Sequence, residues 1–350
     1  MVLPVLRRSA GFVLPTVLVV TSVVTLIFLV AITALASLTR EAGLARARVA
    51  FAQQAMTAEA RLTYLGATER MSPGGLWIDA PLPPGEFEVP DPAREAAFQA
   101  GMANAGDLRL DGRPYRYGAA AIIRLQDQAG MVNLSRLAGP PMSRLMTRLN
   151  VSAADARSLE AALADYSDAD DLRTANGAER SDYPSGSEGP ANRPLRSVDE
   201  LMSVLGARDA IDPSAWRELK PYLAADPASF QLNVNTAGRE ALQILFGMTE
   251  TQARSAIRAR EVQPFYSLEQ VVADTGAALD TDPEAGSVYP SGRIIYTVED
   301  RLSRWTYSGR LTLTPTNSER PFWIDRTEFN EARRSDPEPV NVPEFPAAPR

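Results

Sequence analysis

The first long run of apolar residues extends from Ala10 to Leu38 without a charged side chain. At ~1.5 Å of rise per residue, a helix of this length exceeds the ~30 Å hydrocarbon core of a bilayer. Beyond it, apolar side chains recur in alternating four- and three-residue steps, which is typical of an amphipathic helix. They are Leu38, Ala42, Ala45, Val49, Ala52 and Met56. The pattern predicts one continuous helix over 12–66, membrane-spanning over 12–38 and stopping at Gly66.

Strand-like alternation of apolar and polar side chains appears in two separate parts of the chain. The predicted strands are 108–117, 119–125, 293–298 and 304–314. Strands on both sides of a long helical stretch predict an α+β head, formed by 67–132 and 287–330, with an inserted all-α domain over 133–286. A short helix is expected near 93–103 within a proline-rich loop. The segment 331–350 is polar and rich in proline, and its composition predicts a disordered tail.

The inserted region carries helical periodicity and several helix-start signals. The predicted helices are 141–149, 153–166, 197–205, 213–222, 239–246, 250–261 and 267–274. Ser152, Ser197 and Ser267 each precede a helix and have an acidic or amide side chain three residues later, as capping boxes do.

The amino-acid composition excludes several classes of catalytic and metal-binding site. The 350 residues include no histidine, no cysteine and a single lysine, Lys220. This excludes Ser-His-Asp and Cys-His catalysis, Cys/His zinc sites and disulfides, and any metal must be held by oxygen atoms. The formal charge of −7 argues against nucleic acid as the main partner. We therefore expect no enzyme.

Carboxylates cluster between residues 165 and 183. They can converge if the loop folds back at Asn176-Gly177, and clustered carboxylates without a cation repel one another. A solvated acidic loop and a calcium site both fit this composition. The regular spacing of an EF-hand is missing, and a two-metal hydrolase would need a nucleophile or phosphate clamp that the neighbouring sequence does not supply.

The segment 231–274 is similar to a helix-hairpin-helix unit. DNA-binding versions use a Gly-x-Gly hairpin, but here Thr249 replaces the second glycine. Between Gln231 and Ala273, four arginines and four glutamates leave no net charge. These features favour a protein-packing module in which Asn235-Thr236 caps the following helix. The alternative is a membrane-anchored helix-hairpin-helix DNA-binding protein of a competence system.

The residues before the apolar run allow several interpretations. A cleaved signal peptide would use Ala34-Leu35-Ala36, and a plain membrane anchor would need no cleavage. The sequence Arg7-Arg8-Ser9-Ala10-Gly11-Phe12 instead resembles the processing site of type IV prepilins and type II secretion pseudopilins. The resemblance implies a leader over 1–11, removal of that leader after Gly11 by a prepilin peptidase, and methylation of Phe12. The two arginines keep the N-terminus cytoplasmic.

Most pilin-like subunits carry a glutamate five residues after the cut, which pairs with the N-terminal amine of the subunit above. Here that position is Thr16. A subunit at a filament tip has no such amine to meet, and an unpaired carboxylate in an apolar filament would be costly. The missing glutamate narrows the resemblance to the minor pseudopilin K family of type II secretion systems.

Two further motifs support this resemblance. The junction Asp127-Gln-Ala-Gly130-Met-Val-Asn133-Leu134 resembles a D-x-x-G-x-x-N-L junction of that family. The acidic segment from Asp165 to Asp171, followed by Gly177-Ala178-Glu179, resembles the family's calcium-binding loop. The resemblance implies a structural calcium ion with five candidate ligands: Asp168, Asp170, Asp171, Glu179 and Asp182.

The resemblance also implies a place in the cell. A pilin-like fold would sit at the tip of a periplasmic pseudopilus, in complex with minor pseudopilins I and J and on top of a filament of the major pseudopilin. The single-pass helix would anchor the chain in the bacterial inner membrane, with the head in the periplasm. The expected function is support of the export of folded proteins across the outer membrane.

Overall fold

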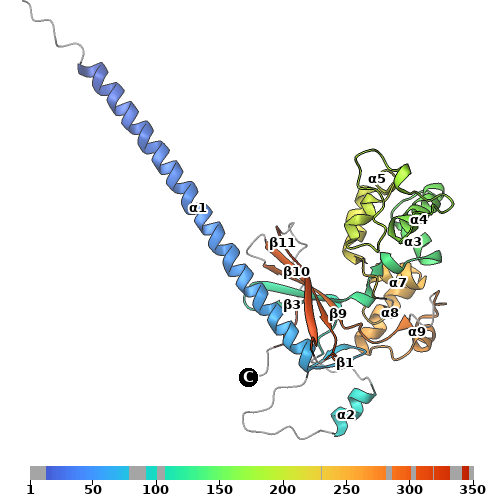
Figure 1. Cartoon of the computed structure of the whole chain (residues 1–350). Helices are drawn as coiled ribbons and strands as arrows, with labels where there is room; N and C mark the ends of the chain where they lie inside the picture. The colour runs from blue at the N-terminus through green and yellow to red at the C-terminus, as the bar shows by residue number, and fades with distance from the viewer. Residues whose placement is uncertain are drawn as a thin grey trace, which may run out of the picture. The chain divides into compact units, whose positions relative to one another are not determined.

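The computed structural model describes residues 13–78, 92–100, 107–229, 231–280, 286–300, 305–317, 319–331 and 341–346. The chain forms two compact units, Met1–Ala55 and Met56–Arg350. The described part of the first unit is a single helix, and the second unit holds a sheet and a helical region, shown in green to orange in Figure 1. The predicted processing residues Gly11 and Phe12 lie outside the described residues.

Helix α1, Val13–Thr68, begins within the apolar run and has the length and composition of a membrane-spanning helix, with a mean hydropathy of 2.7 over its most apolar 18 residues. The apolar side chains between residues 13 and 50 are exposed, as Phe28 is at 63%. Its hydroxyls bond to carbonyl oxygens of the helix itself: Thr21 donates to the Val17 oxygen at 2.8 Å and Ser22 to the Leu18 oxygen at 2.8 Å. A lipid environment requires such internal pairing.

The predicted stop at Gly66 is wrong, because α1 continues to Thr68. A Cβ atom at Gly66 would lie 3.1 to 3.3 Å from the side chains of Leu313 and Leu311. The glycine therefore allows the last turns of α1 to approach the sheet closely. Two turns earlier, Glu59 accepts hydrogen bonds from the hydroxyls of Tyr296 and Tyr307, the latter at 2.6 Å.

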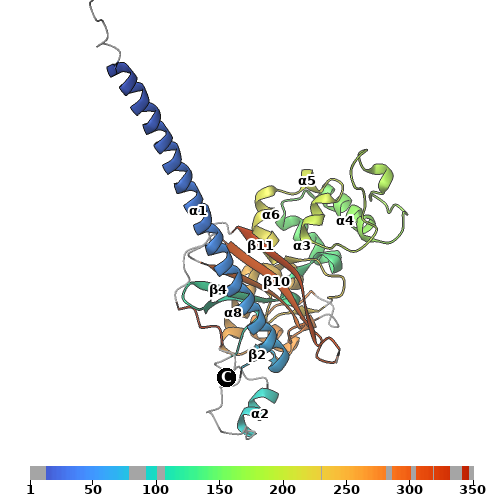
Figure 2. The same ribbon diagram turned by 60° about the vertical axis from the view of Figure 1, so that its left-hand side comes forward.

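The sheet of the second unit has five antiparallel strands in the order β11-β10-β9-β4-β3. Three of them, β4, β10 and β11, are labelled in Figure 2. The strands are β3, Asp111–Tyr117; β4, Ala121–Asp127; β9, Arg293–Asp300; β10, Trp305–Leu313; and β11, Phe322–Glu331. Because β4 pairs directly with β9, the two predicted groups of strands join into one sheet, and the long stretch between them is an insertion. The predicted α+β fold class is confirmed.

Outside the insertion, three strands were not predicted. Strands β1, Arg70–Ser72, and β2, Gly75–Trp77, form a short hairpin where the sequence predicts a loop. Strand β11 forms an edge of the main sheet. Helix α2, Pro92–Gln99, matches the short helix expected near 93–103, although 101–106 lie outside the described residues.

The insertion is built of short helices and two small parallel strand pairs. Its α-helices are α3, Gly139–Arg148; α4, Ala153–Ser167; α5, Ala207–Ala210; α6, Pro213–Leu219; α7, Arg239–Phe246; α8, Glu250–Val262; and α9, Leu268–Thr275. Its 3-10 helices are η1, Gln128–Gly130; η2, Leu134–Arg136; η3, Arg180–Asp182; η4, Val198–Ser203; and η5, Lys220–Tyr222. Its strands are β5, Val132–Asn133; β6, Leu223–Ala224; β7, Leu232–Asn233; and β8, Gly286–Ser287.

These helices share one hydrophobic core that runs from Val132 to Ala277. Leu145, Leu242 and Phe265 are fully buried members of this core. Two of the predicted caps are present, because Ser152 and Ser267 accept hydrogen bonds from backbone N–H groups three residues on. Ser197 makes no such bond, and the segment after it is the 3-10 helix η4 instead of an α-helix.

The prediction of a disordered tail over 331–350 is wrong for 341–346. Val342 and Phe345 are buried, and the backbone of this segment pairs with Arg116 of β3. Composition suggested disorder because the tail contains many prolines. A short extended segment needs few apolar residues, however, when a strand edge supplies its hydrogen bonds.

Candidate metal centre

The insertion is joined to the sheet by the motif that begins at Asp127, the last residue of β4. The Asp127 side chain is fully buried and accepts five hydrogen bonds. Its donors are the backbone of Ala129, the side chains of Asn233 and Thr236, and both the backbone and the hydroxyl of Ser291. One carboxylate therefore fastens both chain crossings between the sheet and the insertion.

The other residues of the motif also have structural roles. A Cβ atom at Gly130 would lie 2.5 Å from the backbone of Thr236, so only glycine permits this approach. Asn133 donates to the backbone oxygens of Asp226 at 2.7 Å and Ser229 at 2.8 Å, and it accepts from the Asp226 N–H at 3.0 Å. The junction motif thus reflects close backbone packing.

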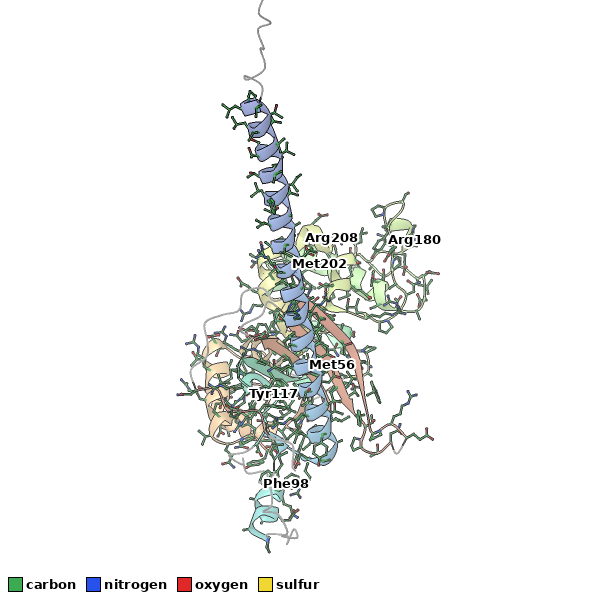
Figure 3. The ribbon with its side chains drawn as sticks, turned by 90° about the vertical axis from the view of Figure 1, so that its left-hand side faces the viewer. Met56, Phe98, Tyr117, Arg180, Met202 and Arg208 are labelled. Atoms are coloured by element: carbon green, nitrogen blue, oxygen red, sulfur yellow. The ribbon has the colours of Figure 1, made fainter. Side chains whose placement is uncertain are left out.

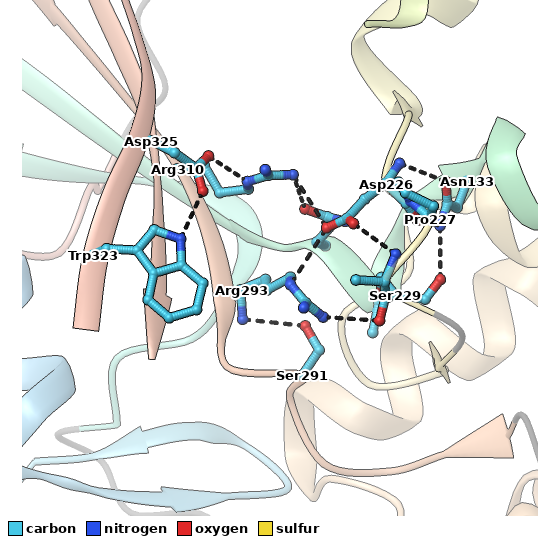
Figure 4. A network of polar contacts seen from close by, with 12 residues as sticks. Asn133, Asp226, Pro227, Ser229, Ser291, Arg293, Arg310, Trp323 and Asp325 are labelled. Carbon is cyan, nitrogen blue, oxygen red and sulfur yellow. Dashed lines mark hydrogen bonds and ion pairs between the residues drawn. The ribbon is translucent and has the colours of Figure 1, made fainter. Parts of the chain in front are cut away.

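A second buried carboxylate, Asp226, lies between the insertion and strands β9 and β10 (Figure 4). It forms ion pairs with Arg293 at 3.3 Å and Arg310 at 3.1 Å and accepts from Gln128 at 2.8 Å. Arg310 also forms an ion pair with Asp325 of β11, with Nε 2.6 Å from Oδ1. Every charge of this network has a partner within the chain.

The acidic loop begins at the C-terminal end of α4. Asp165 in the last turn is fully buried, and its carboxylate accepts from the backbone N–H of Thr174 at 3.1 and 3.2 Å. The loop folds back at Asn176, where φ is +67°, and Gly177 lies directly against the Asp165 carboxylate, where a Cβ atom would not fit. This is the fold-back that convergence of the carboxylates requires.

Glu179 is the exceptional residue of this loop. Its side chain is only 6% exposed, yet neither of its carboxylate oxygens has a hydrogen-bond partner among the residues that the structure describes. Oδ1 of Asp168, the residue that caps α4, is buried and also lacks a partner. A buried carboxylate with no donor costs several kcal/mol, on the order of 1–3 or more. Within the described part of the chain, no group donates a hydrogen bond to these three oxygens.

Electrostatics link these two residues to the rest of the loop. Burial raises the pKa of Glu179, and the negative charges of Asp165, Asp168, Asp171 and Asp170 raise it further. Burial also raises the pKa of Asp168, with Asp170 and Asp165 adding to the effect. The carboxylates around Glu179 therefore repel one another, and a bound cation would relieve this repulsion.

The remaining predicted ligands are more exposed and partly engaged. Asp170 accepts from the backbone N–H of Leu172 at 2.8 Å, and Asp171 accepts from Asn192 at 2.8 Å. Asp182 uses both oxygens, one for Arg173 at 3.1 Å and one for the backbone N–H of Glu179 at 3.0 Å. Asp182 thus already supports the loop conformation.

Among the described residues, no three acidic side chains already stand together in a metal-ligating arrangement. The donor set still fits calcium, which takes six to eight oxygen ligands in a flexible geometry. The buried, unpartnered oxygens are those that a cation would neutralise. The loop lies on the outer part of the insertion, where Figure 3 labels Arg180.

Sequence reasoning missed two polar residues of this region. Asp165 belongs to the acidic segment but is not among the five predicted ligands, although it is fully buried beside the loop. Asn192 donates to the Asp170 backbone oxygen at 3.2 Å, while its own side-chain oxygen is buried without a partner. Its left-handed backbone, with φ of +46°, could not be predicted from composition.

The helix-hairpin-helix-like unit consists of α7, α8 and α9. Gly247 ends α7 with φ of +68°, and Thr249 caps α8 in a capping box with Gln252. The prediction that Asn235-Thr236 caps α7 is wrong, because the N-cap is Gly238. Asn235 and Thr236 are buried and bond instead to Phe265, Val288 and Asp127.

Comparison with known proteins identifies relatives for these features. The family described as "Type II secretion system (T2SS), protein K" matches residues 124–228, which include the junction motif and the acidic loop. Type II secretion system protein K of Pectobacterium carotovorum is 32% identical over 140 residues, and that of Pseudomonas aeruginosa is 29% identical over 164 residues. These alignments cover 38% and 43% of this chain and 41% and 47% of the relatives. The chain thus spans less than half the length of the curated relatives it matches.

A solved structure extends the likeness to most of the fold. A chain in the crystal structure of the GspK-GspI-GspJ complex from the type 2 secretion system of enterotoxigenic Escherichia coli matches with a TM-score of 0.55. The match covers 84% of this chain and 99% of that chain at 20% identity. The resemblance to protein K of type II secretion systems is confirmed, in sequence over residues 124–228 and in fold over most of the chain.

Proposed function

We propose that this chain is a minor pseudopilin of a type II secretion system that caps the tip of the periplasmic pseudopilus together with minor pseudopilins I and J. The observation that carries the proposal is the insertion between β4 and β9, which contains all but the first residues of the stretch matched by the protein K family. A helical region of this size on a pilin-like head leaves a filament little room for a further subunit above it. The role is structural and non-catalytic.

Thr16 of α1 supports a position at the tip. In pilin-like subunits this position usually holds a glutamate that pairs with the amine of a subunit above. Threonine is uncharged and does not require a cationic partner in an apolar environment. The proposal also includes cleavage by a prepilin peptidase after Gly11 and methylation of Phe12, on the basis of the sequence before α1. Intact-mass measurement of the membrane form tests this directly, since an unmodified Met1 would contradict it.

The helix α1 anchors the chain in a membrane, and the proposal places it in the bacterial inner membrane with the N-terminus in the cytoplasm and the head in the periplasm. Fractionation followed by protease treatment of spheroplasts tests this orientation. The head should be degraded from the periplasmic side, and protection of the head would contradict the assignment.

The proposal includes a structural calcium ion at the acidic loop. Glu179 and Asp168 would hold the ion through their unpartnered oxygens, and Asp170 and Asp171 would complete the ligand set. The bound ion would fix a long loop with few apolar residues. Asp182 belongs to the same loop, where its bonds to Arg173 and Glu179 give it a supporting role.

The charges of the helix-hairpin-helix-like unit argue against the DNA-binding alternative. Arg239 and Arg254 form ion pairs with glutamates at 2.7 Å. Arg260 is buried and donates to the backbone oxygens of Val234 and Ala237 at 2.7 and 2.6 Å. These groups are therefore engaged within the protein, and a purified chain that retards DNA at physiological salt would revive the alternative.

Co-purification tests the function itself. The full chain, co-expressed in detergent-extractable form with minor pseudopilins I and J of the same bacterium, should elute with both in one complex. The major pseudopilin extracted in the same way is the control and should elute separately. Elution of I and J together without this chain would contradict the proposal.

A further inference from the structure

Strand β3 is at the edge of the main sheet, but part of that edge is covered. The segment Asn341–Pro346 runs parallel to β3, with Glu344 opposite Arg116. The Arg116 N–H donates to the Pro343 oxygen at 2.8 Å, and the Phe345 N–H donates to the Arg116 oxygen at 2.8 Å. These are the two bonds with which an added strand engages an edge residue.

Phe345 anchors this segment. Its side chain is 4% exposed and meets the rings of Tyr115 and Tyr117 edge-on, with centroids 6.4 and 5.9 Å apart. Edge-to-face packing at these separations is favourable beyond the burial of apolar area. The anchor therefore fills a site whose walls are the side chains of β3; Tyr117 is labelled in Figure 3.

Arg61 of α1 closes the site from the helix side. Its guanidinium carbon lies 5.4 Å from the centre of the Phe345 ring and 5.7 Å from that of Tyr117, and Nη2 donates to the Phe345 oxygen at 3.3 Å. Cation–π contact and a backbone hydrogen bond thus reach the same residue. The Arg61 Nε atom is buried and has no hydrogen-bond partner among the described residues, so the hydrogen bond of this guanidinium to the segment comes from Nη2 alone.

The segment has the composition of an extended ligand. Pro343 and Pro346 flank the pair Glu344-Phe345, which restricts the backbone to extended conformations and reduces the entropy lost on docking. Neither proline has an N–H group with which to continue the ladder outward. Glu344 forms an exposed ion pair with Arg116 at 3.4 Å, which contributes little affinity.

We propose that the β3 edge, with Arg61, Tyr115 and Tyr117, is a binding site for an extended Pro-Glu-Phe-Pro peptide, and that residues 343–346 of this chain occupy it in cis. An occupied site covers the Arg116 part of β3, one of the two edge strands of the described five-stranded sheet, and a covered stretch of edge cannot pair with another strand. The other edge, β11, then remains the open one among the described strands. The inference does not depend on the proposed function.

A peptide in trans tests the site. A fluorescent synthetic peptide of residues 340–348 is titrated into two detergent-purified proteins, the full chain and a variant that ends at Glu331. The variant should bind the peptide at least about tenfold more tightly than the full chain, whose site is filled. A peptide with Phe345→Ala should bind the variant at least about tenfold more weakly, and a peptide with Glu344→Gln should bind within about twofold of the original.

Two outcomes would overturn the proposal: no binding by a variant that retains the circular dichroism of the full chain, or equal binding by both proteins. If the variant does not fold, hydrogen exchange on the full chain decides. The amides of Arg116 and Phe345 should be protected in the unchanged protein, and Phe345→Ala should abolish both protections while leaving those of β9 intact. Glu344→Gln is the matched control, and unchanged protection of Arg116 in Phe345→Ala would contradict the site.

Discussion

Two regions of the insertion bury carboxylates in opposite ways. At the junction with the sheet, Asp127 receives five hydrogen bonds and Asp226 is paired with two arginines. In the acidic loop, Glu179 is nearly as deeply buried, but neither of its oxygens has a partner. The junction carboxylates are thus paired within the described residues, whereas the Glu179 carboxylate is not.

This difference teaches how a binding site can be distinguished from a structural one. Burial raises the pKa of both Asp127 and Glu179. For Asp127 the hydrogen bonds from Ser291 and Thr236 act against that rise, while for Glu179 the neighbouring carboxylates add to it. Burial alone is thus uninformative, and the presence or absence of donors separates the two roles.

The largest effect should follow from breaking the junction. Asp127→Ala leaves Asn233, Thr236 and Ser291 without their acceptor, and we expect a loss of about 3–5 kcal/mol in the free energy of unfolding. Denaturant unfolding of the full chain, followed by tryptophan fluorescence, measures this loss. Asp209→Ala at an exposed position is the control and should cost less than about 0.5 kcal/mol. Equal stability of the two variants would show that the junction is not the fastening point.

Removal of calcium should have the next largest effect. If the ion is present at 100 times its dissociation constant, chelation with EDTA removes about 2.7 kcal/mol, which lowers the Tm of the head by about 5–10 °C. Glu179→Gln should lower the Tm of the calcium-loaded protein and abolish the response to EDTA. Asp209→Asn should retain the full response, and a wild-type Tm that EDTA leaves unchanged would remove the ion from the proposal.

The calcium-free loop should also respond to pH with a defined sign. The pKa of Glu179 is raised above its ordinary value of 4.5, so the folded state binds this proton more tightly than the unfolded state. Stability therefore rises as pH falls from 7 through the raised pKa, and the gain levels off near 4.5. With EDTA present, the Tm of the wild type should increase relative to that of Glu179→Gln over this range. Asp127 is common to both proteins, so the difference isolates Glu179, and a parallel pH profile of the two would contradict the prediction.

The sequence predicted those elements whose residues share one periodicity. The apolar run of α1, the alternation in β4, β9 and β10, and most helices of the insertion were found because packing on one face dictates the pattern. Strand β11 was missed because it lies at a sheet edge, where Trp323 is 40% exposed and alternation is not enforced.

Other features depend on contacts between distant residues. Local sequence predicts a helix stop at Gly66, but the glycine instead provides room for strand β10 to pack against α1. It also predicts a disordered tail, but Phe345 packs against Tyr115 and Tyr117. The acidic loop could be located from its residue types. Local sequence could not reveal that Glu179 lacks donors while Asp182 has them, because Asn176 and Gly177 determine how the loop folds back.

The smallest expected effect separates ligands from supporting residues inside the loop. The amide oxygen of Asp182→Asn can still accept a hydrogen bond from Arg173 or from the Glu179 N–H. The apparent affinity for calcium should therefore fall by less than about threefold. Asp168→Asn replaces a group whose buried oxygen has no partner in the chain, and the affinity should fall by about tenfold or more. Calcium titration followed by the Tm of each full-length variant measures both values. If both variants lose the same affinity for calcium, Asp182 binds the ion directly, and its hydrogen bonds to Arg173 and Glu179 break when calcium binds.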